Sequence, residues 1–305
     1  MEKLTQKVKV ALIGLGSMGQ NHYRVLKGLP EFELVALCDI QQTKEYDEPF
    51  YTDLEELLEK ADFEAAVIVV PTFLHKSVAL KCLEKGKDLF IEKPVASNCK
   101  EAKEILEAAK KADAKVCVGY IERFNPVVEA LKNELEGKEI YSIGITRVGP
   151  FPPRIADVGI LTDLSVHDID LIRYITEHEI EHVSIYKSQK IHNHHEDNAI
   201  LSFQLSGDIV ASITTNWLTP FRKRTIEVAT KEGYYEADLM AQDLTEYSEY
   251  QRNNSYVIRK VMVKKEEPLI REHKAFAAYI LTGDRHGLSS IEDSMITLDI
   301  SSRKS

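Results

Sequence analysis

Residues 13–19, Ile-Gly-Leu-Gly-Ser-Met-Gly, determine how the N-terminal part of this chain folds. An apolar run over 7–13 precedes this G-x-G-x-x-G stretch, and a helical pattern over 17–27 follows it. In a strand–turn–helix unit the first glycine allows a tight turn. The second lets the backbone approach a pyrophosphate, and the third lets the helix pack on the strand. The stretch therefore predicts a dinucleotide site at the start of the helix, where the helix dipole favours negative charge.

The first 120 residues alternate apolar strand-like runs with helical patterns. We expect strands over 7–13, 33–39, 65–70, 88–92 and 115–119, and helices over 17–27, 53–60, 76–84 and 101–111. Several of the strands are apolar at consecutive positions, which is typical of a parallel sheet covered on both faces. Repeated strand–helix–strand units give right-handed crossovers, so we predict an α/β, doubly wound parallel sheet of the Rossmann type.

Asp39 ends the second expected strand, where an acidic residue binds the ribose of a dinucleotide. Its carboxylate can accept hydrogen bonds from both ribose hydroxyls, and it would repel a 2′-phosphate. No arginine follows it directly, so the sequence favours NAD over NADP as the cofactor. The alternative, glycines that merely punctuate a turn beside a solvated aspartate, fits the strand–helix context less well.

Two further segments fall at the same edge of the predicted sheet, where ligands of doubly wound folds bind. VPTFLH at 70–75 ends the third strand, and EKP at 92–94 ends the fourth. Taken alone, Lys93 reads more simply as a solvated lysine before a proline. Together these segments give the expected cofactor-binding set, which is Gly14, Gly16, Ser17, Met18, Gly19, Asp39, Pro71, Thr72, His75, Glu92 and Lys93.

The pattern changes after about residue 124. We expect strands over 139–148, 181–189, 199–205, 209–215, 224–230, 233–239 and 256–263, and helices over 126–135, 160–176, 268–281 and 290–300. A Ser-Gly-Asp turn at 206–208 joins two alternating runs into a hairpin. The prediction is an NAD-binding domain over 1–122 and an α+β domain over 123–305. This second domain would have a large, mostly antiparallel, open sheet with helices on one face.

Composition excludes several classes of protein. The chain has 305 residues, 29% of them charged, and a net charge of -10, which argues against nucleic-acid partners. No apolar run approaches the roughly 20 residues of a membrane helix, and we see no room for a signal peptide before the first strand. Cys38, Cys82, Cys99 and Cys117 are widely spaced. They suit a reducing compartment, so we expect a cytoplasmic protein without a membrane partner.

Five segments together resemble the glucose–fructose oxidoreductase/inositol dehydrogenase/MocA (Gfo/Idh/MocA) family in order and spacing. They are GLGSMG with Asp39, VPTFLH at 70–75, EKP at 92–94, GYIERFNP at 119–126 and DLSVH at 163–167. The resemblance implies a Rossmann domain followed by a domain whose open sheet often builds dimers or tetramers, so we expect a homodimer or homotetramer. It also implies that Lys93 belongs to a catalytic pair, that the bond from Lys93 to Pro94 can be cis, and that Asp163 and His167 occupy the family's D-x-x-x-H positions.

A narrower resemblance concerns the substrate. RVGPFPPR at 147–154 and NWLTP at 216–220 are similar to the UDP-N-acetylglucosamine 3-dehydrogenase branch, which oxidises the sugar C3 hydroxyl. This implies a UDP-N-acetylhexosamine, or a near relative, as substrate. The alternatives are a dehydrogenase of a free sugar or of a polyol such as inositol, a non-catalytic NAD-binding regulator, and an NAD-dependent glycosidase. One departure is that residues 39–63 hold only one clear helix, where the family usually has two.

Asp163, His167 and Asp170 are spaced to share one stripe of a helix that is otherwise strongly apolar. A structural Asp–His hydrogen bond is one reading of this stripe. In the other reading His167 is the general base of an alcohol oxidation, because imidazole titrates near neutral pH. Asp163 would then orient a substrate hydroxyl or the imidazole. Lys93 would stabilise developing alkoxide charge, or would itself be the base if burial lowers its pKa.

The expected substrate contacts are less strongly indicated. Tyr120, Arg123 and Asn125 follow the fifth strand and are expected to line the crevice. Arg154 and Arg222, with Lys223 and Arg224, could clamp a diphosphate or could simply be solvated. Trp217 is either a core anchor or a platform for substrate. His192, His194 and His195 lack a further ligand at convincing spacing, and hydride transfer to NAD needs no metal, so we expect no metal site.

Overall fold

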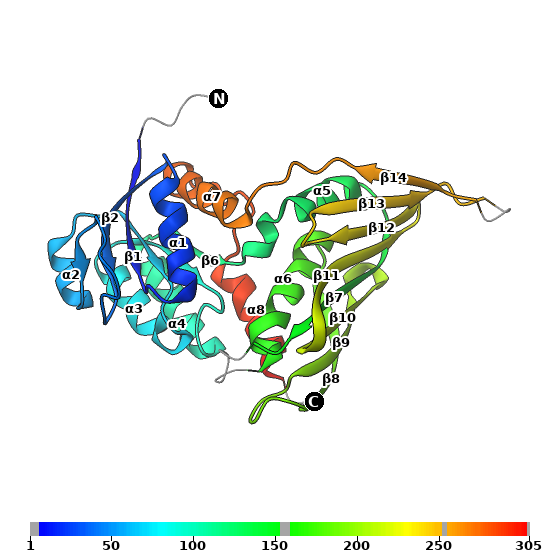
Figure 1. Cartoon of the computed structure of the whole chain (residues 1–305), viewed down its shortest axis with the longest axis horizontal. Helices are drawn as coiled ribbons and strands as arrows, with labels where there is room; N and C mark the ends of the chain where they lie inside the picture. The colour runs from blue at the N-terminus through cyan, green and yellow to red at the C-terminus, as the bar shows by residue number, and fades with distance from the viewer. Residues whose placement is uncertain (1–5, 153–158, 252–254, 304–305) are drawn as a thin grey trace. The chain divides into compact units, whose positions relative to one another are not determined.

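The computed structural model describes residues 6–152, 159–251 and 255–303, and it divides into two compact units (Figure 1). Unit 1 comprises Met1–Ile121 and Glu267–Ile296, and unit 2 comprises Glu122–Glu266 and Thr297–Ser305. The sequence predicted one boundary, after residue 122. The chain instead returns to unit 1 near its end, because helix α7 (Pro268–Thr282) packs on helix α1 (Ser17–Gly28) and strand β1 (Val8–Ile13).

Unit 1 is built on a six-stranded parallel sheet in the order β3-β2-β1-β4-β5-β6. After β1, its strands are β2 (Phe32–Cys38), β3 (Phe50–Tyr51), β4 (Ala65–Ile68), β5 (Asp88–Glu92) and β6 (Val116–Gly119). Besides α1 and α7, its helices are α2 (Leu54–Lys60), α3 (Thr72–Glu84) and α4 (Cys99–Ala112). This confirms the predicted doubly wound parallel sheet. The strand order reverses at β1, which pairs with both β2 and β4, and ligands of such folds bind at the carboxyl ends there.

Unit 2 is built on an eight-stranded sheet in the order β14-β13-β12-β11-β7-β10-β9-β8. Its strands are β7 (Ile140–Pro150), β8 (Ile180–Ser188), β9 (Asn198–Leu205), β10 (Ile209–Asn216), β11 (Leu218–Thr230), β12 (Gly233–Asp238), β13 (Asp243–Ser248) and β14 (Val257–Val261). Among the strand pairs of the described residues in this sheet, only that of β10 with β7 is parallel. The predicted hairpin is confirmed, with Leu205 opposite Ile209 across a turn in which Gly207 has a φ of 77°.

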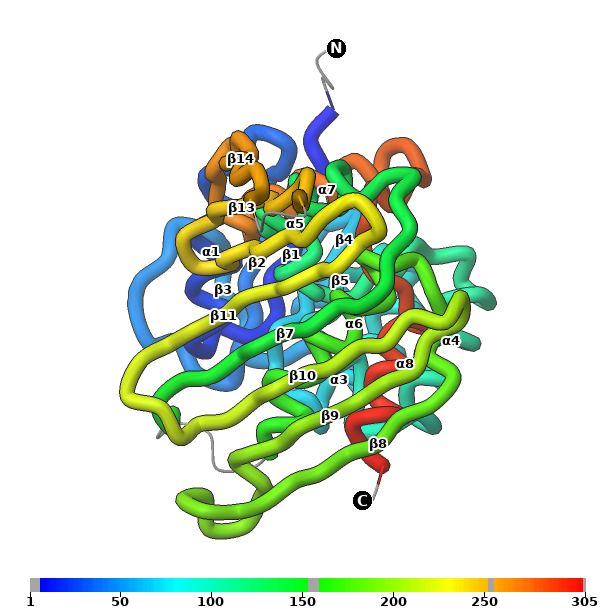
Figure 2. Tube along the Cα trace, turned by 90° about the vertical axis from the view of Figure 1, so that its right-hand side faces the viewer, coloured from blue at the N-terminus to red at the C-terminus, as the bar shows by residue number. Residues whose placement is uncertain are grey.

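Helices cover one face of this second sheet. Helix α5 (Pro126–Leu135) packs on β12 and β13, and helix α6 (Val166–Thr176) packs on β7 and β10. Figure 2 looks onto the other face, with β8 to β11 in front of α5 and α6. Along β9 and β10 buried and exposed side chains alternate, so apolar residues such as Ile200 and Val210 are exposed on the outer face. The remaining elements are short turns of helix, η1 (Ile121–Phe124), η2 (Leu161–Ser165) and η3 (Ser206–Asp208), and helix α8 (Ile291–Ser302).

Two strands were not predicted. β3 has two residues, too few to give a periodic pattern. β13 buries Leu244, Thr245 and Glu246 in succession, so it lacks the alternation that marks a half-buried strand. No helix among the described residues is long and apolar enough to span a membrane.

Candidate functional site

The glycine-rich loop after β1 has the geometry that a bound pyrophosphate requires. Gly14 has a φ of 98°, and a Cβ there would lie 2.5 Å from the carbonyl oxygen of Val69. A Cβ on Gly19 would collide with the carbonyl oxygen of Gly14. Beside Gly16, by contrast, a Cβ would meet nothing within 4 Å, so its backbone is open to a ligand. Helix α1 begins at Ser17 with no side-chain cap and no acidic residue in its first turn, which leaves its N-terminus available to phosphate oxygens.

Asp39 follows β2 and lies beside this loop. One carboxylate oxygen, Oδ2, accepts a hydrogen bond from the backbone N–H of Leu15 at 2.6 Å. The aspartate is half-buried, and Ile40 after it is exposed. The loop therefore holds Asp39 by one oxygen, and residues 40–43 bring no positive charge beside it. This arrangement fits a ribose with free hydroxyls better than one with a 2′-phosphate.

The segment after β4 is tied to the segment after β5 by His75. Helix α3 begins at Thr72, directly after Pro71, and His75 lies in its first turn, 1% exposed. Its Nε2 lies 2.8 Å from the carbonyl oxygen of Val70, and its Nδ1 lies 2.9 Å from that of Pro94. Burial lowers the pKa of His75, so the neutral ring donates to one of these oxygens. The ring thus braces the two loops, whereas the sequence predicted a contact with the cofactor.

Glu92 ends β5 and Lys93 follows it, at the same edge of the sheet. The Oε2 atom of Glu92 accepts a hydrogen bond from the backbone N–H of Lys93 at 3.0 Å, and its Oε1 lies 2.9 Å from the Nε2 of His22. The bond between Lys93 and Pro94 is cis, as the resemblance implies. Lys93 is half-buried, and Glu92 is 9% exposed. The carboxylate therefore fixes the backbone at Lys93.

Tyr120 has a different position from the one predicted. It follows β6 and is 1% exposed, and its hydroxyl lies 3.2 Å from the Oγ of Ser294 on helix α8. The side chain belongs to the core of unit 1, where it packs under the C-terminal segment. The sequence could not show this, because Ser294 is far along the chain.

In unit 2, Asp163 and His167 lie on either side of a change in helical form. Residues 160–176 were predicted as one helix, but Leu161–Ser165 forms a π-turn before α6 begins at Val166. Asp163 lies in the π-turn and is half-buried, whereas His167 is 9% exposed in the first turn of α6. Asp170, the third member of the predicted stripe, is 1% exposed and belongs to a buried ion pair.

That ion pair is formed with Arg123. The Nε of Arg123 donates to Asp170 Oδ2 at 2.7 Å, and one of its terminal nitrogens donates to Asp170 Oδ1 at 2.5 Å. Both side chains are buried, and the Arg123 guanidinium also lies over the ring of Tyr174. Asn125 caps helix α5 and donates to the carbonyl oxygen of Leu239 at 2.9 Å. Arg123 and Asn125, predicted to line the substrate crevice, therefore hold η1 and α5 within unit 2.

A second buried network joins β7, β11, η1 and α6. The Nε of Arg147 donates to Asp168 at 2.8 Å, and Arg147 also donates to Glu122 Oε1 at 2.8 Å, which Arg224 approaches at 3.2 Å. Burial raises the pKa of Asp168 to about 6 against the effect of Arg147. Burial also acts to raise the pKa of Glu122, but Arg147 and Arg224 outweigh it and the net shift is downward. Arg224 therefore donates a hydrogen bond to this network.

The remaining predicted substrate residues are dispersed. Trp217 is 3% exposed, with Phe151 at 5.7 Å edge-on and His192 stacked at 6.4 Å between ring centroids, so it anchors the core. Arg222 is exposed on β11, with its stem against Gly149 of β7. Arg154 lies outside the described residues. His192 accepts hydrogen bonds at Nδ1 from the N–H groups of His194 and His195, both at 3.0 Å, which shapes a turn.

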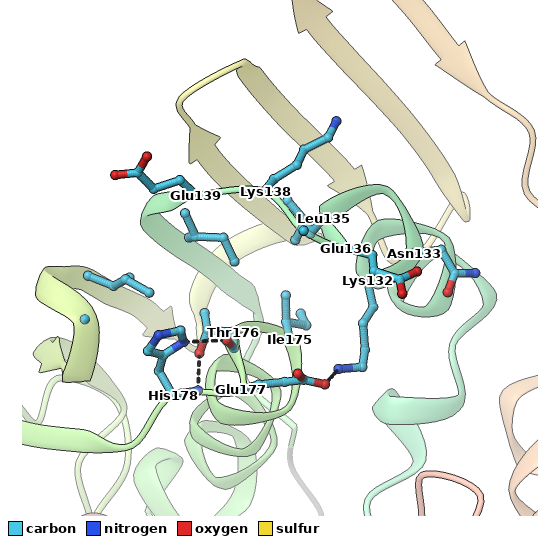
Figure 3. A pocket seen from close by; sticks show the side chains of 14 residues that line it. Lys132, Asn133, Leu135, Glu136, Lys138, Glu139, Ile175, Thr176, Glu177 and His178 are labelled. Carbon is cyan, nitrogen blue, oxygen red and sulfur yellow. Dashed lines mark hydrogen bonds and ion pairs between the residues drawn. The ribbon is translucent and has the colours of Figure 1, made fainter.

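A cavity of about 460 Å³ lies in unit 2 (Figure 3). It opens between the C-terminal ends of α5 and α6 and the start of β7. Lys132 pairs there with Glu177, and the Nδ1 of His178 donates to the carbonyl oxygen of Thr176 at 2.6 Å. Its lining includes none of the predicted site residues.

Two histidines of unit 1 were missed by the sequence reasoning. His22 lies on the buried stripe of α1 with Gly19, Val25 and Leu26, and His273 lies on the buried stripe of α7. Both are 0% exposed. A histidine on the apolar face of a helix must find a polar partner, so the position of His22 was a usable signal. The sequence could not identify the partner of His22, because His273 is 251 residues away along the chain.

Both units match models of known protein families. Residues 8–120 match the model of an oxidoreductase family with an NAD-binding Rossmann fold, GFO_IDH_MocA, and residues 148–236 match its GFO/IDH/MocA C-terminal domain. Together the two segments take in about two thirds of the chain.

Curated relatives include scyllo-inositol 2-dehydrogenase (NAD(+)) of Bacillus subtilis (strain 168), which is 33% identical over 196 residues, or 59% of this chain and 57% of that protein. Myo-inositol 2-dehydrogenase of Thermotoga maritima is 30% identical over 190 residues, or 58% of this chain and 57% of that protein. This chain therefore matches 57% of the length of each of these relatives.

Solved structures of similar fold include UDP-N-acetylglucosamine 3-dehydrogenase GnnA from Acidithiobacillus ferrooxidans. It has a TM-score of 0.89 at 20% identity, covering 97% of this chain and 96% of that one. An oxidoreductase from Agrobacterium radiobacter, in complex with NAD+, L-tartaric acid and magnesium, has a TM-score of 0.85 at 17% identity, covering 97% and 94% of the two chains. At these identities the likeness shows a shared fold.

Proposed function

Because the chain belongs to the Gfo/Idh/MocA oxidoreductase family, we propose that it is an NAD-dependent dehydrogenase that oxidises a secondary hydroxyl of a sugar or polyol. The observation that carries this proposal is the geometry of the glycine-rich loop. Gly16 leaves its backbone open at the start of α1, and Leu15 holds Asp39 beside it. Together they offer N–H groups to a pyrophosphate and a carboxylate to a ribose.

We assign chemical roles to one residue of unit 1 and two of unit 2. When bound, NAD accepts the hydride from the carbinol carbon. His167 takes the hydroxyl proton as general base, and Asp163 orients the hydroxyl or the imidazole. Lys93 donates a hydrogen bond to the reacting oxygen and stabilises its developing negative charge. The alternative is that Lys93 is the base, and the pH dependence of its variants separates the two.

For the substrate we propose a UDP-linked N-acetylhexosamine, oxidised at C3. Its support is the pair of segments at 147–154 and 216–220, together with the exposed guanidinium of Arg222 on β11, which suits a diphosphate. The second candidate is a free polyol. It is favoured by the curated relatives, which are named as inositol dehydrogenases.

The deciding experiment measures NADH formation with NAD and a panel of UDP-hexosamines, UDP-hexosaminuronates, free sugars and inositols, with mass spectrometry of each product. A UDP-sugar that loses two hydrogens supports the first substrate, and inositol turnover alone supports the second. Failure to oxidise any of the panel, with NAD still bound, would favour a non-catalytic NAD-binding regulator. Arg222→Ala should weaken the binding of a UDP-sugar and leave the binding of a polyol unchanged.

We also propose that the protein is a cytoplasmic homodimer or homotetramer joined through the outer face of the second sheet. Tyr186, Ile200 and Val210 are 69%, 49% and 55% exposed there, which is costly for a sheet that faces water alone. The four cysteines form no disulfide, which fits a reducing compartment. Light scattering of the wild type and of Val210→Lys tests the assembly, because a buried lysine should dissociate it.

A further inference from the structure

A line of hydrogen bonds runs through the core of unit 1 from helix α7 to the end of β5. The Nε2 of His273 lies 2.8 Å from the Nδ1 of His22, and the Nε2 of His22 lies 2.9 Å from Glu92 Oε1. The other oxygen of Glu92 accepts from the backbone N–H of Lys93 at 3.0 Å. Both histidines are fully buried, so water does not compete for these bonds.

The direction of this line follows from its end at Glu92. An ionised carboxylate only accepts, so the Nε2 of His22 carries a proton and donates it. In a neutral His22 ring the Nδ1 is then an acceptor, and the Nε2 of His273 must be the donor. Among the described residues the Nδ1 of His273 has no hydrogen-bond partner. The opposite direction would put an N–H on that atom with nothing to receive it, which costs more than an unused lone pair.

The surroundings hold each member of the line in place. The ring of His273 packs against Phe90 at 5.2 Å and Phe32 at 5.9 Å between ring centroids, and His22 packs against Phe90 at 5.6 Å. Gly119 of β6 leaves the room that Glu92 occupies, since a Cβ there would lie 3.2 Å from Glu92 Oε1 and 2.8 Å from the Phe90 ring. The aromatic groups therefore hold the two imidazole rings, and Gly119 borders the space of the Glu92 carboxylate.

Glu92 acts on Lys93 from one side of the turn, and a second group acts from the other. His75 lies 2.9 Å from the carbonyl oxygen of Pro94, the residue after Lys93. The N–H of Lys93 and the carbonyl of Pro94 are thus both held by buried side chains. The direction in which the Lys93 side chain leaves the backbone depends on these two bonds.

We propose that His273, acting through His22 and Glu92, is a positioning residue for Lys93. The proposal rests on the proposed function in that it takes Lys93 as a group that acts on the reacting oxygen. It gives the chain's C-terminal segment a part in catalysis, since α7 supplies the first donor of the line. Neither histidine touches cofactor or substrate in this scheme. Their effect is transmitted by the position of the Lys93 backbone.

The test uses His273→Phe, with Phe276→Leu as the matched control. A phenylalanine suits the aromatic cluster at this position but cannot donate to His22, whereas Phe276→Leu disturbs the same cluster and leaves the hydrogen bonds intact. We expect His273→Phe to lower kcat by about 10-fold to 100-fold with little change in KM, as when a reacting group is displaced. Phe276→Leu should lower stability and leave kcat unchanged. His273→Gln, which keeps a donor, should recover most of the loss.

A second readout does not need turnover. In 15N-lysine-labelled protein, with the Lys93 amide assigned from Lys93→Arg, the Lys93 signal should move in His273→Phe and stay in Phe276→Leu. The imidazole 15N shifts of the wild type should show both His22 and His273 protonated at Nε2. An unmoved Lys93 amide, or an unchanged kcat in an active enzyme, overturns the proposal.

The outcomes also separate this proposal from the proposed function. If the wild type oxidises no sugar or polyol, the dehydrogenase assignment fails while the amide signal still decides whether His273 positions Lys93. If His273→Phe does not fold, Glu92→Gln takes its place. If the glutamine oxygen faces His22, the Lys93 N–H loses its acceptor. If the oxygen faces Lys93, the amide nitrogen donates to His22 and the line reverses, which leaves an N–H on the Nδ1 of His273 without an acceptor. In either orientation the line of donors is broken, so a loss of kcat and an amide shift are expected.

Discussion

The carboxylate of Asp39 accepts a hydrogen bond from the backbone N–H of Leu15 at 2.6 Å. This bond links the end of β2 to the glycine-rich loop after β1, two neighbouring strands on one side of the point between β1 and β4 where the strand order of the first sheet reverses. One oxygen of Asp39 therefore shapes the loop, and we propose that the carboxylate charge selects NAD over NADP.

Asp39→Asn and Asp39→Ala should separate these two roles. Both variants remove the negative charge, so both should lower the affinity for NAD about 10-fold to 100-fold, which is the cost of losing a charge-assisted hydrogen bond. Both should also relax the discrimination against NADP. Only the alanine also frees Leu15, so it should lose more unfolding free energy. Dissociation constants for both cofactors and denaturant melts measure this. An unchanged NAD to NADP ratio in both variants would remove Asp39 from cofactor selection.

Gly19→Ala and Gly16→Ala should fail in different ways. The methyl group of the first collides with Gly14, so the helix or the loop must move, at about 1–3 kcal/mol of stability. The methyl group of the second meets no protein atom within 4 Å, so the fold should change by less than about 1 kcal/mol. Gly16→Ala should still lower the affinity for NAD, because the added methyl group occupies space that the pyrophosphate needs. Equal NAD affinity in Gly16→Ala and the wild type would contradict this placement of the cofactor.

Lys93→Ala and His167→Ala should each lower kcat by about 10²- to 10⁴-fold, the usual contribution of a general acid or base, with NAD affinity largely kept. Lys93→Arg and His167→Gln refine the assignment. If His167 is the base, Lys93→Arg keeps a positive charge and retains part of the rate, and the pH profile keeps the wild-type acid limb. Near-native turnover in either alanine variant would exclude that residue from the mechanism.

Arg147→Leu should cost about 3–5 kcal/mol of unfolding free energy, because it leaves Asp168 and Glu122 buried with less compensation. Lys60→Ala is the control. Its pairing with Glu56 is solvent-exposed on α2, so its loss should leave the free energy of unfolding nearly unchanged. Denaturant unfolding measures both variants. A similar small effect in the two would show that the Arg147 network is hydrated rather than buried.

His273→Phe should also change how stability depends on pH. Burial, with His22 nearby, lowers the pKa of His273 well below 6.5, so the folded protein keeps it neutral. Below that pH the unfolded chain binds a proton that the folded chain does not, and stability falls as pH falls. The phenylalanine removes this contribution. The variant should therefore gain stability relative to the wild type between about pH 7 and pH 5, and a constant difference would show that His273 titrates normally.

The sequence predicted the parts of the fold that depend on local periodicity. The buried runs of β1 and β4 and the alternation along β9 and β10 are readable within a few residues, and the structure has these strands where they were expected. β13 could not be found this way. Its buried Glu246 is stabilised by the Tyr235 hydroxyl and by Arg259, residues of neighbouring strands that a local window does not relate to it.

The candidate site was predictable to the same extent. The glycine-rich loop, Asp39 and Lys93 follow strands of a parallel sheet, so their common edge follows from topology alone. Arg123 was predicted to meet substrate because it follows β6, but its partner is Asp170, on a helix 47 residues later. A charged residue at a strand end has the same local signal in a salt bridge as in a binding site, and only the tertiary structure tells them apart.

The return of α7 to the first unit orders events during synthesis. Domains generally fold as they leave the ribosome, N-terminal part first. Here the face of α1 that carries His22 meets its partner His273 only after Glu122–Glu266, the larger segment of the second unit, has been made. A nascent chain of 121 residues would expose that face. His22 and the Phe32 and Phe90 rings, which pack on His273 in the folded protein, would then be in contact with water. The dinucleotide-binding unit is therefore completed only after most of the second unit has been made, and a premature stop codon before α7 should leave α1 and β1 without the helix that packs on them.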